Sequence, residues 1–114
     1  MDAKSRKELR SRYMEREITG GVYAIKNKIS NKLLVESTVD MQGVKNRFEF
    51  SQKTGNCIYH KLREDWAESG GGQFAFETLE ELKKGDAQTQ AEFMEDVALL
   101  KNMWLEKLSS ESLY

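Results

Sequence analysis

The chain has 114 residues, about one domain, and its 39% hydrophobic and 32% charged residues are typical of a globular protein and not of a disordered one. No run of residues approaches the roughly 18 apolar positions that a membrane-spanning helix needs, and the charged N-terminus is unlike a secretory signal. A single Cys and a single His exclude an internal disulfide and argue against a Cys/His zinc site. We therefore expect a cytoplasmic protein in a reducing compartment.

The net charge of −1 is unevenly distributed along the chain. Residues 1–65 carry 14 Lys and Arg against 9 Asp and Glu, whereas residues 66–114 carry 4 against 10. This asymmetry permits one basic and one acidic face, although the two halves of a sequence need not form separate surfaces. The charge alone therefore argues neither for nor against binding of nucleic acid.

The first half of the chain predicts a helix and then a hairpin. Residues 3–17 are charged apart from a thin apolar stripe, which predicts a helix that ends before the Gly pair "GG". Alternating side chains then predict antiparallel strands over residues 21–28 and 32–37. Asn31 is suited to the left-handed position of the turn between them.

Two helices, a strand and a last helix are predicted in the remainder. Val44 and Phe48 lie one turn apart in the first helix, and Ile58, Leu62 and Trp66 recur at helical spacing, which places all three on the buried face of the second. "QFAFETLEEL" has the alternation of a strand over residues 73–80. "TQAE" matches the capping box that begins a helix.

Several short motifs in this order resemble the GIY-YIG nuclease superfamily, in its small bacterial and phage single-domain form. The matching pieces are "GVY", "ST" at the end of the second strand, "NRFEFSQKTG", "DWAESGG" and "FAFETLEEL". The resemblance implies a GIY-YIG-like α+β fold, with a three-stranded antiparallel sheet flanked by helices. It divides the chain into an N-terminal helical extension (1–19), a GIY-YIG-like domain (20–108) and a frayed tail (109–114).

The resemblance also implies a site that hydrolyses phosphodiesters with the help of a divalent metal. In such a site a Tyr helps to activate water, an Arg stabilises the phosphate and a Glu holds the metal ion. Tyr23 matches the Tyr of the first motif, and Glu77 matches the metal-binding Glu. Without the resemblance, Tyr23 would be taken for a packing aromatic and Glu77 for a solvated carboxylate.

Three other positions depart from the family pattern. The second Tyr falls on Leu34, the Gly after it on Glu36, and the helical Arg on Val44. Arg47, one turn later, matches a second basic position and could replace the missing Arg, although on its own it would be a surface cation. Glu36 places a carboxylate where phosphate would approach, which should repel it.

Two functions follow from this mixture of matches and losses. The first is a non-cleaving module that binds nucleic acid or protein. The alternative is an active endonuclease that uses Tyr23, Arg47 and Glu77 with Mg²⁺ or Mn²⁺. For the binding module we expect a monomer whose contacts with DNA are weak, independent of sequence and remote from the old cleft. These contacts would come from Lys4, Arg6, Lys7, Arg10 and Arg47.

Overall fold

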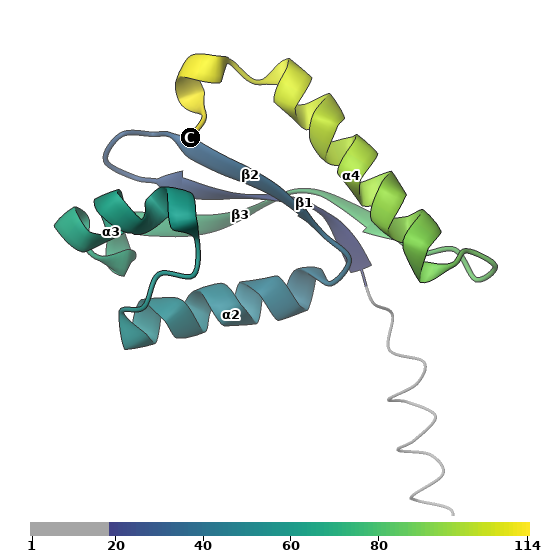
Figure 1. The fold of residues 1–114 in the computed structure, drawn as a ribbon, viewed down its shortest axis with the longest axis horizontal. Coiled ribbons are helices and arrows are strands. Elements are labelled where there is room, and N and C mark those ends of the chain that lie inside the picture. Colours follow the sequence, from purple (N-terminus) through teal and green to yellow (C-terminus); the bar gives the residue numbers. More distant parts are fainter. Residues whose placement is uncertain (1–18) are drawn as a thin grey trace, which may run out of the picture.

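The structure, a computed structural model, describes residues 19–114 (Figure 1). Its sheet contains the strands β1 (Thr19–Asn27), β2 (Leu33–Thr38) and β3 (Phe74–Lys83) in the order β2-β1-β3, with both pairings antiparallel. The three predicted strands and the predicted α+β class are therefore confirmed. The strand that carries Tyr23 is central and is hydrogen-bonded on both edges.

The turn between β1 and β2 depends on two Asn residues. Asn31 adopts a left-handed backbone with φ 63°, as its place in the turn predicts. The side-chain oxygen of Asn27 accepts from the backbone N–H of Ile29 at 2.9 Å and of Ser30 at 3.3 Å. These bonds hold the turn and so fix the register in which Tyr23 faces Glu36.

Helices cover both faces of the sheet (Figure 1). One face carries α2 (Met41–Thr54) and α3 (Arg63–Ser69), and the other carries α4 (Gln90–Lys107). Asp40 caps α2 by accepting from the backbone N–H of Gly43, and Thr89 and Glu92 form the predicted capping box of α4. The short 3₁₀ helices are η1 (His60–Leu62), η2 (Gly71–Gln73) and η3 (Ser110–Ser112).

Alternation along the strands divides the hydrophobic core into two parts. Tyr23 and Ile25 pack with residues of α2 and α3, including Phe48 and Trp66. Val22, Ala24 and Val35 point the other way and pack against α4 residues such as Leu100 and Trp104. We call the first side of the sheet the α2 face and the second the α4 face.

The second helix begins later than predicted. Residues 55–59 are irregular, η1 starts at His60, and Ile58 is 51% exposed, so its predicted place beside Leu62 and Trp66 is wrong. The indole N–H of Trp66 donates to the carbonyl of Gly55 at 3.3 Å, which holds the irregular segment against the helix. Tertiary contacts of this loop therefore override the helical spacing of its apolar residues.

The predicted frayed tail at residues 109–114 is wrong. Ser110–Ser112 form η3, and Leu113 makes a bridge with Leu33 at the start of β2. The hydroxyl of Tyr114 donates to Asp65 at 2.6 Å and accepts from the Asn27 amide at 2.9 Å. These contacts dock the last residues on the hairpin and α3.

Two predictions lie outside the described residues: the helix over 3–17, and with it the basic side chains Lys4, Arg6, Lys7 and Arg10. Within residues 19–114 no helix has the length and apolar character needed to cross a membrane.

Candidate functional site

A hollow of about 420 Å³ lies on the α2 face of the sheet. It is bordered by β1, the end of β2, the middle of α2 and the irregular segment before η1. The residues that line it are Tyr23, Ser37, Thr38, Val44, Arg47, Ile58 and Tyr59. Two candidates from the sequence, Tyr23 and Arg47, therefore lie at one site.

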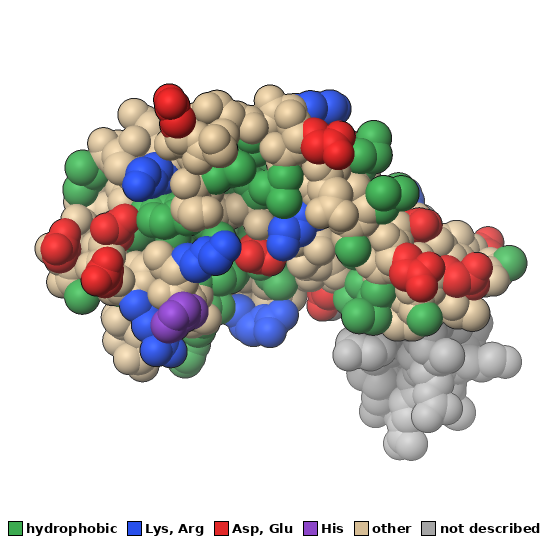
Figure 2. Space-filling model, turned by 45° about the horizontal axis from the view of Figure 1, so that its top comes forward, with side chains coloured by type: hydrophobic (Ala, Val, Ile, Leu, Met, Phe, Trp, Pro, Cys, Tyr) green, Lys and Arg blue, Asp and Glu red, His purple; other side chains and the backbone are tan. Residues whose placement is uncertain are grey.

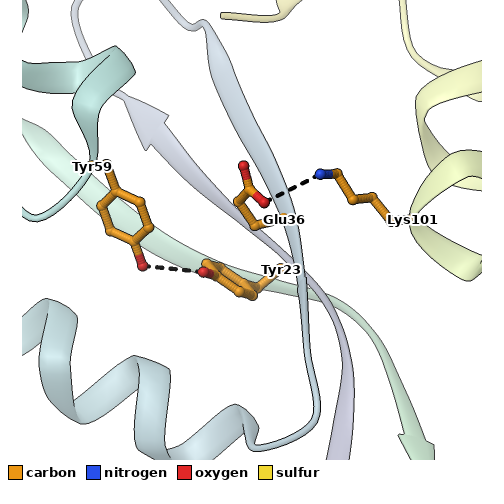
Figure 3. A network of polar contacts seen from close by, with 4 residues as sticks. All are labelled: Tyr23, Glu36, Tyr59 and Lys101. Carbon is orange, nitrogen blue, oxygen red and sulfur yellow. Dashed lines mark hydrogen bonds and ion pairs between the residues drawn. The ribbon is translucent and has the colours of Figure 1, made fainter. Parts of the chain in front are cut away.

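Tyr23 is held rigidly at the bottom of this hollow. It lies at a bulge in the pairing of β1 with β3, and only 4% of the residue is exposed. Its ring stacks on Phe76 with the centroids 5.0 Å apart, and its hydroxyl lies 3.2 Å from that of Tyr59 (Figure 3). The ring belongs to the core, while the hydroxyl belongs to the site.

Burial makes both phenols weaker acids than an exposed Tyr. It is the main reason that the pKa of Tyr23 is far above the ordinary value of 10.0, and the hydrogen bond with Tyr59 raises it further. Burial also raises the pKa of Tyr59, against a smaller lowering by its hydrogen bond with Tyr23. At neutral pH these hydroxyls can donate hydrogen bonds to an anion, but they are poor bases.

Arg47 supplies the positive charge of the hollow. Its side chain is exposed on α2, and its charge lowers the pKa of both Tyr23 and Tyr59 against the stronger effect of burial. Val44, one turn earlier, is 7% exposed and packs in the core. Helix α2 therefore brings the Arg47 guanidinium to the hydroxyls of Tyr23 and Tyr59. Arg47 lies one turn after Val44, the position at which the family has its Arg.

Glu36 lies beside the hollow, paired with a lysine from the other side of the sheet. It stands opposite Tyr23 in the β1–β2 register, and the Lys101 ammonium contacts its carboxylate at 3.2 Å (Figure 3). Glu36 therefore has a cation beside it, and the expectation that its carboxylate opposes phosphate stays a prediction. The sequence signalled nothing of this contact, because the two residues are 65 positions apart.

Glu77 does not join the site. It pairs with Ala24, and it lies between Phe76, which packs on the α2 face, and Leu79, which packs on the α4 face. Since side chains alternate along a strand, Glu77 points to the α4 face, opposite to Phe76. Glu77 therefore lies on the opposite face of the sheet from the hollow that Tyr23 and Arg47 line.

The acidic side chains around the hollow do not fit a divalent metal. Across residues 19–114 no group of three or more His, Cys, Asp or Glu is arranged to hold a metal ion. Mg²⁺ needs carboxylate oxygens that can turn toward it. Glu36 is engaged with Lys101, and Glu77 is on the wrong face.

Tyr59 is the residue that sequence reasoning missed. Leu34, at the position of the second Tyr, is 4% exposed and packs in the core of the α2 face. Tyr59 instead brings a second hydroxyl to Tyr23 from the loop. The predicted helix with Ile58, Leu62 and Trp66 on its buried face placed Tyr59 off that face, and only the irregular course of residues 55–59 turns it inward.

Charged side chains are unevenly distributed over one face of the molecule. Figure 2 shows Lys and Arg side chains across the middle of one face of the molecule, with exposed hydrophobic side chains between them. Most Asp and Glu side chains of that view lie toward its two ends. A local excess of positive charge can attract a polyanion although the net charge of the chain is −1.

Solved structures with the same fold exist, although no protein-family model and no curated protein matches the chain. A mutant of the catalytic domain of the intron endonuclease I-TevI superposes with a TM-score of 0.61 and 24% identity, over 85% of this chain and 92% of that domain. The catalytic domain of the homing endonuclease I-TevI superposes with a TM-score of 0.60 and 25% identity, over 83% of this chain and 95% of that domain. The predicted resemblance to the GIY-YIG superfamily is confirmed in the fold.

Proposed function

We propose that this chain, whose fold is that of the GIY-YIG nuclease superfamily, is a nucleic-acid-binding module that holds a backbone phosphate without cleaving it. The observation that carries the proposal is the convergence of Tyr23, Tyr59 and Arg47 on one hollow. An Arg guanidinium can grip a phosphate with two parallel hydrogen bonds, and hydroxyl groups complete such contacts in many protein–DNA interfaces. Because these contacts read only the backbone, binding would be independent of sequence.

Among residues 19–114, the lining of this hollow holds only part of what phosphodiester hydrolysis requires. The reaction needs an activated water and stabilisation of the developing charge at the same time. Both phenols hold their protons too tightly to act as bases near neutral pH, as the raised pKa of Tyr59 and of Tyr23 indicates. Val44 adds neither charge nor a hydrogen bond. Binding without cleavage is therefore the better match to this set of residues.

The alternative is an active endonuclease that uses Tyr23, Arg47 and Glu77 with Mg²⁺ or Mn²⁺. The likeness to the catalytic domain of an endonuclease, over most of both chains, favours it. Against it stands the position of Glu77 on the α4 face, so that within the described part of the chain the hollow has no free carboxylate. A plasmid incubated with the protein and Mg²⁺ or Mn²⁺ should remain supercoiled. Nicking that Glu77→Ala abolishes would replace the binding proposal by the endonuclease.

NMR titration of the full chain with a short DNA duplex tests the proposal. At low salt we expect the amide signals of Tyr23, Arg47 and Tyr59 to shift, with weak affinity that decreases as salt is added. Arg47→Gln should weaken binding about tenfold, as expected for one good phosphate contact. Lys53→Gln removes the same charge from the same helix outside the lining of the hollow, and should change affinity about twofold or less.

Other patterns of shifts would contradict the proposal. Shifts confined to residues 4–16 would assign the DNA contacts to Lys4, Arg6, Lys7 and Arg10, away from the hollow. The absence of any shift would leave binding of a protein partner as the better function.

A further inference from the structure

We infer that Lys101 of α4 is a positioning residue of the anion site, which makes the hollow accept phosphate by neutralising Glu36. The inference rests on the proposed function, because it concerns the same hollow. It adds a residue that does not line the hollow and that comes from the opposite side of the sheet.

The geometry places Glu36 between the phenols and Lys101 (Figure 3). Glu36 stands directly opposite Tyr23, and the next two residues of β2, Ser37 and Thr38, line the hollow. Because β2 is an edge strand, the Lys101 side chain reaches round it from α4 and contacts the carboxylate at 3.2 Å. Both side chains are partly covered, with 28% of Lys101 and 34% of Glu36 exposed.

The charge of Glu36 reaches the place where an anion would bind. Burial is the main cause of the raised pKa of Tyr23 and of Tyr59, and the Glu36 charge adds a smaller raising effect at both hydroxyls. The same charge would oppose a phosphate that accepts hydrogen bonds from them. In our proposal the contact with Lys101 offsets the Glu36 carboxylate, which leaves the Arg47 guanidinium as the uncompensated charge near the two hydroxyls. Without Lys101, Glu36 would cancel Arg47, and the hollow would lose its net attraction for anions.

Lys107 provides a matched comparison on the same helix. Its ammonium lies over the ring of Trp104, 5.2 Å from the centroid, and it does not line the hollow. Both lysines add one positive charge to α4, so general attraction of DNA should respond equally to the loss of either. Only Lys101 should act through Glu36.

Fluorescence anisotropy with a labelled short DNA duplex at low salt tests the inference on the full chain. Lys101→Gln should weaken binding about tenfold, and Lys107→Gln about twofold or less. Glu36→Gln should tighten binding, and Lys101→Gln in the Glu36→Gln background should then have little further effect. Lys101→Arg keeps the charge and should keep the affinity. Thermal unfolding of each variant verifies that it is folded. Loss of the partly exposed ion pair between Lys101 and Glu36 should change the melting temperature very little.

Two results would overturn the inference, and they are distinguishable. Equal losses for Lys101→Gln and Lys107→Gln, with hollow-centred shifts in the parent chain, would leave the proposed function intact and refute the role of Lys101. A parent chain that binds no duplex would refute the proposed function and this inference together. Loss of affinity in Lys101→Gln that Glu36→Gln does not restore would also refute it, because Lys101 would then act independently of Glu36.

Discussion

Replacing Tyr59 by Phe removes one oxygen from the hollow and leaves the ring in place. The lost interaction is the hydrogen bond to the hydroxyl of Tyr23, with the oxygens 3.2 Å apart. A bond between neutral groups contributes about 0.5–1.5 kcal/mol to stability. Water in the open hollow can replace part of it, so we expect a loss of about 0.5–1 kcal/mol, at the lower end of that range. In a domain of this size the melting temperature should fall by about 2–8 °C.

The assay is a double-mutant cycle measured by urea unfolding. Tyr23→Phe breaks the same bond from the other side and keeps the stacking on Phe76. Because the two changes remove one shared bond, the double variant should cost less than the sum of the single ones by about 0.5 kcal/mol or more. Tyr59→Phe should also weaken binding of a DNA duplex about fivefold, through the loss of one donor to phosphate. Strictly additive costs together with unchanged affinity would refute the shared hydroxyl pair.

Three further changes test other parts of the structure. Trp66 is 5% exposed, and its ring stacks on Phe74 with the centroids 5.1 Å apart. Trp66→Ala should therefore lower the free energy of unfolding by about 3–5 kcal/mol, and a loss below about 1 kcal/mol in chemical denaturation would contradict its burial. Tyr114→Phe removes the hydroxyl that donates to Asp65, so the C-terminal amides should exchange hydrogen faster while those of β1 do not. Glu92 accepts from the backbone N–H of Thr89, which holds the pKa of Glu92 below its ordinary value of 4.5. The Glu92 carboxylate therefore stabilises the fold fully above its ordinary pKa, and this stabilisation is lost as the pH falls through the lowered pKa. The Glu92→Gln variant should accordingly lose less stability on acidification than the parent chain, as measured by unfolding at several pH values.

Patterns within single elements were enough to predict most of the fold. Alternation predicted all three strands, and spacing predicted the burial of Leu62 and Trp66. Such patterns report which face of an element is apolar, and this depends mainly on neighbouring residues. The pattern failed at Ile58, where contacts from elsewhere in the fold keep residues 55–59 out of the helix.

The site was less predictable because its members meet across the chain. Tyr23 and Arg47 could be identified from motifs, but the side chains that contact the groups of the site could not. Tyr59 reaches Tyr23 from 36 residues away, and Lys101 reaches Glu36 from 65. A motif match placed a metal ligand at Glu77, and only the strand register put that residue on the opposite face. Position along the sequence predicts the element that carries a residue more readily than the side chain that it contacts.

The central place of β1 has a consequence for folding kinetics. The β1–β2 hairpin can close quickly through its short turn, within about 1–10 μs, whereas Tyr23 pairs with Thr78 across more than 50 residues of chain. Long-range pairing of this kind slows folding, because the entropy of loop closure is lost before the contacts form. An isolated two-stranded hairpin is only marginally stable in water. Since Tyr59 lies inside that long loop, the two hydroxyls should come together only late on the folding pathway, and their contact would report completed folding.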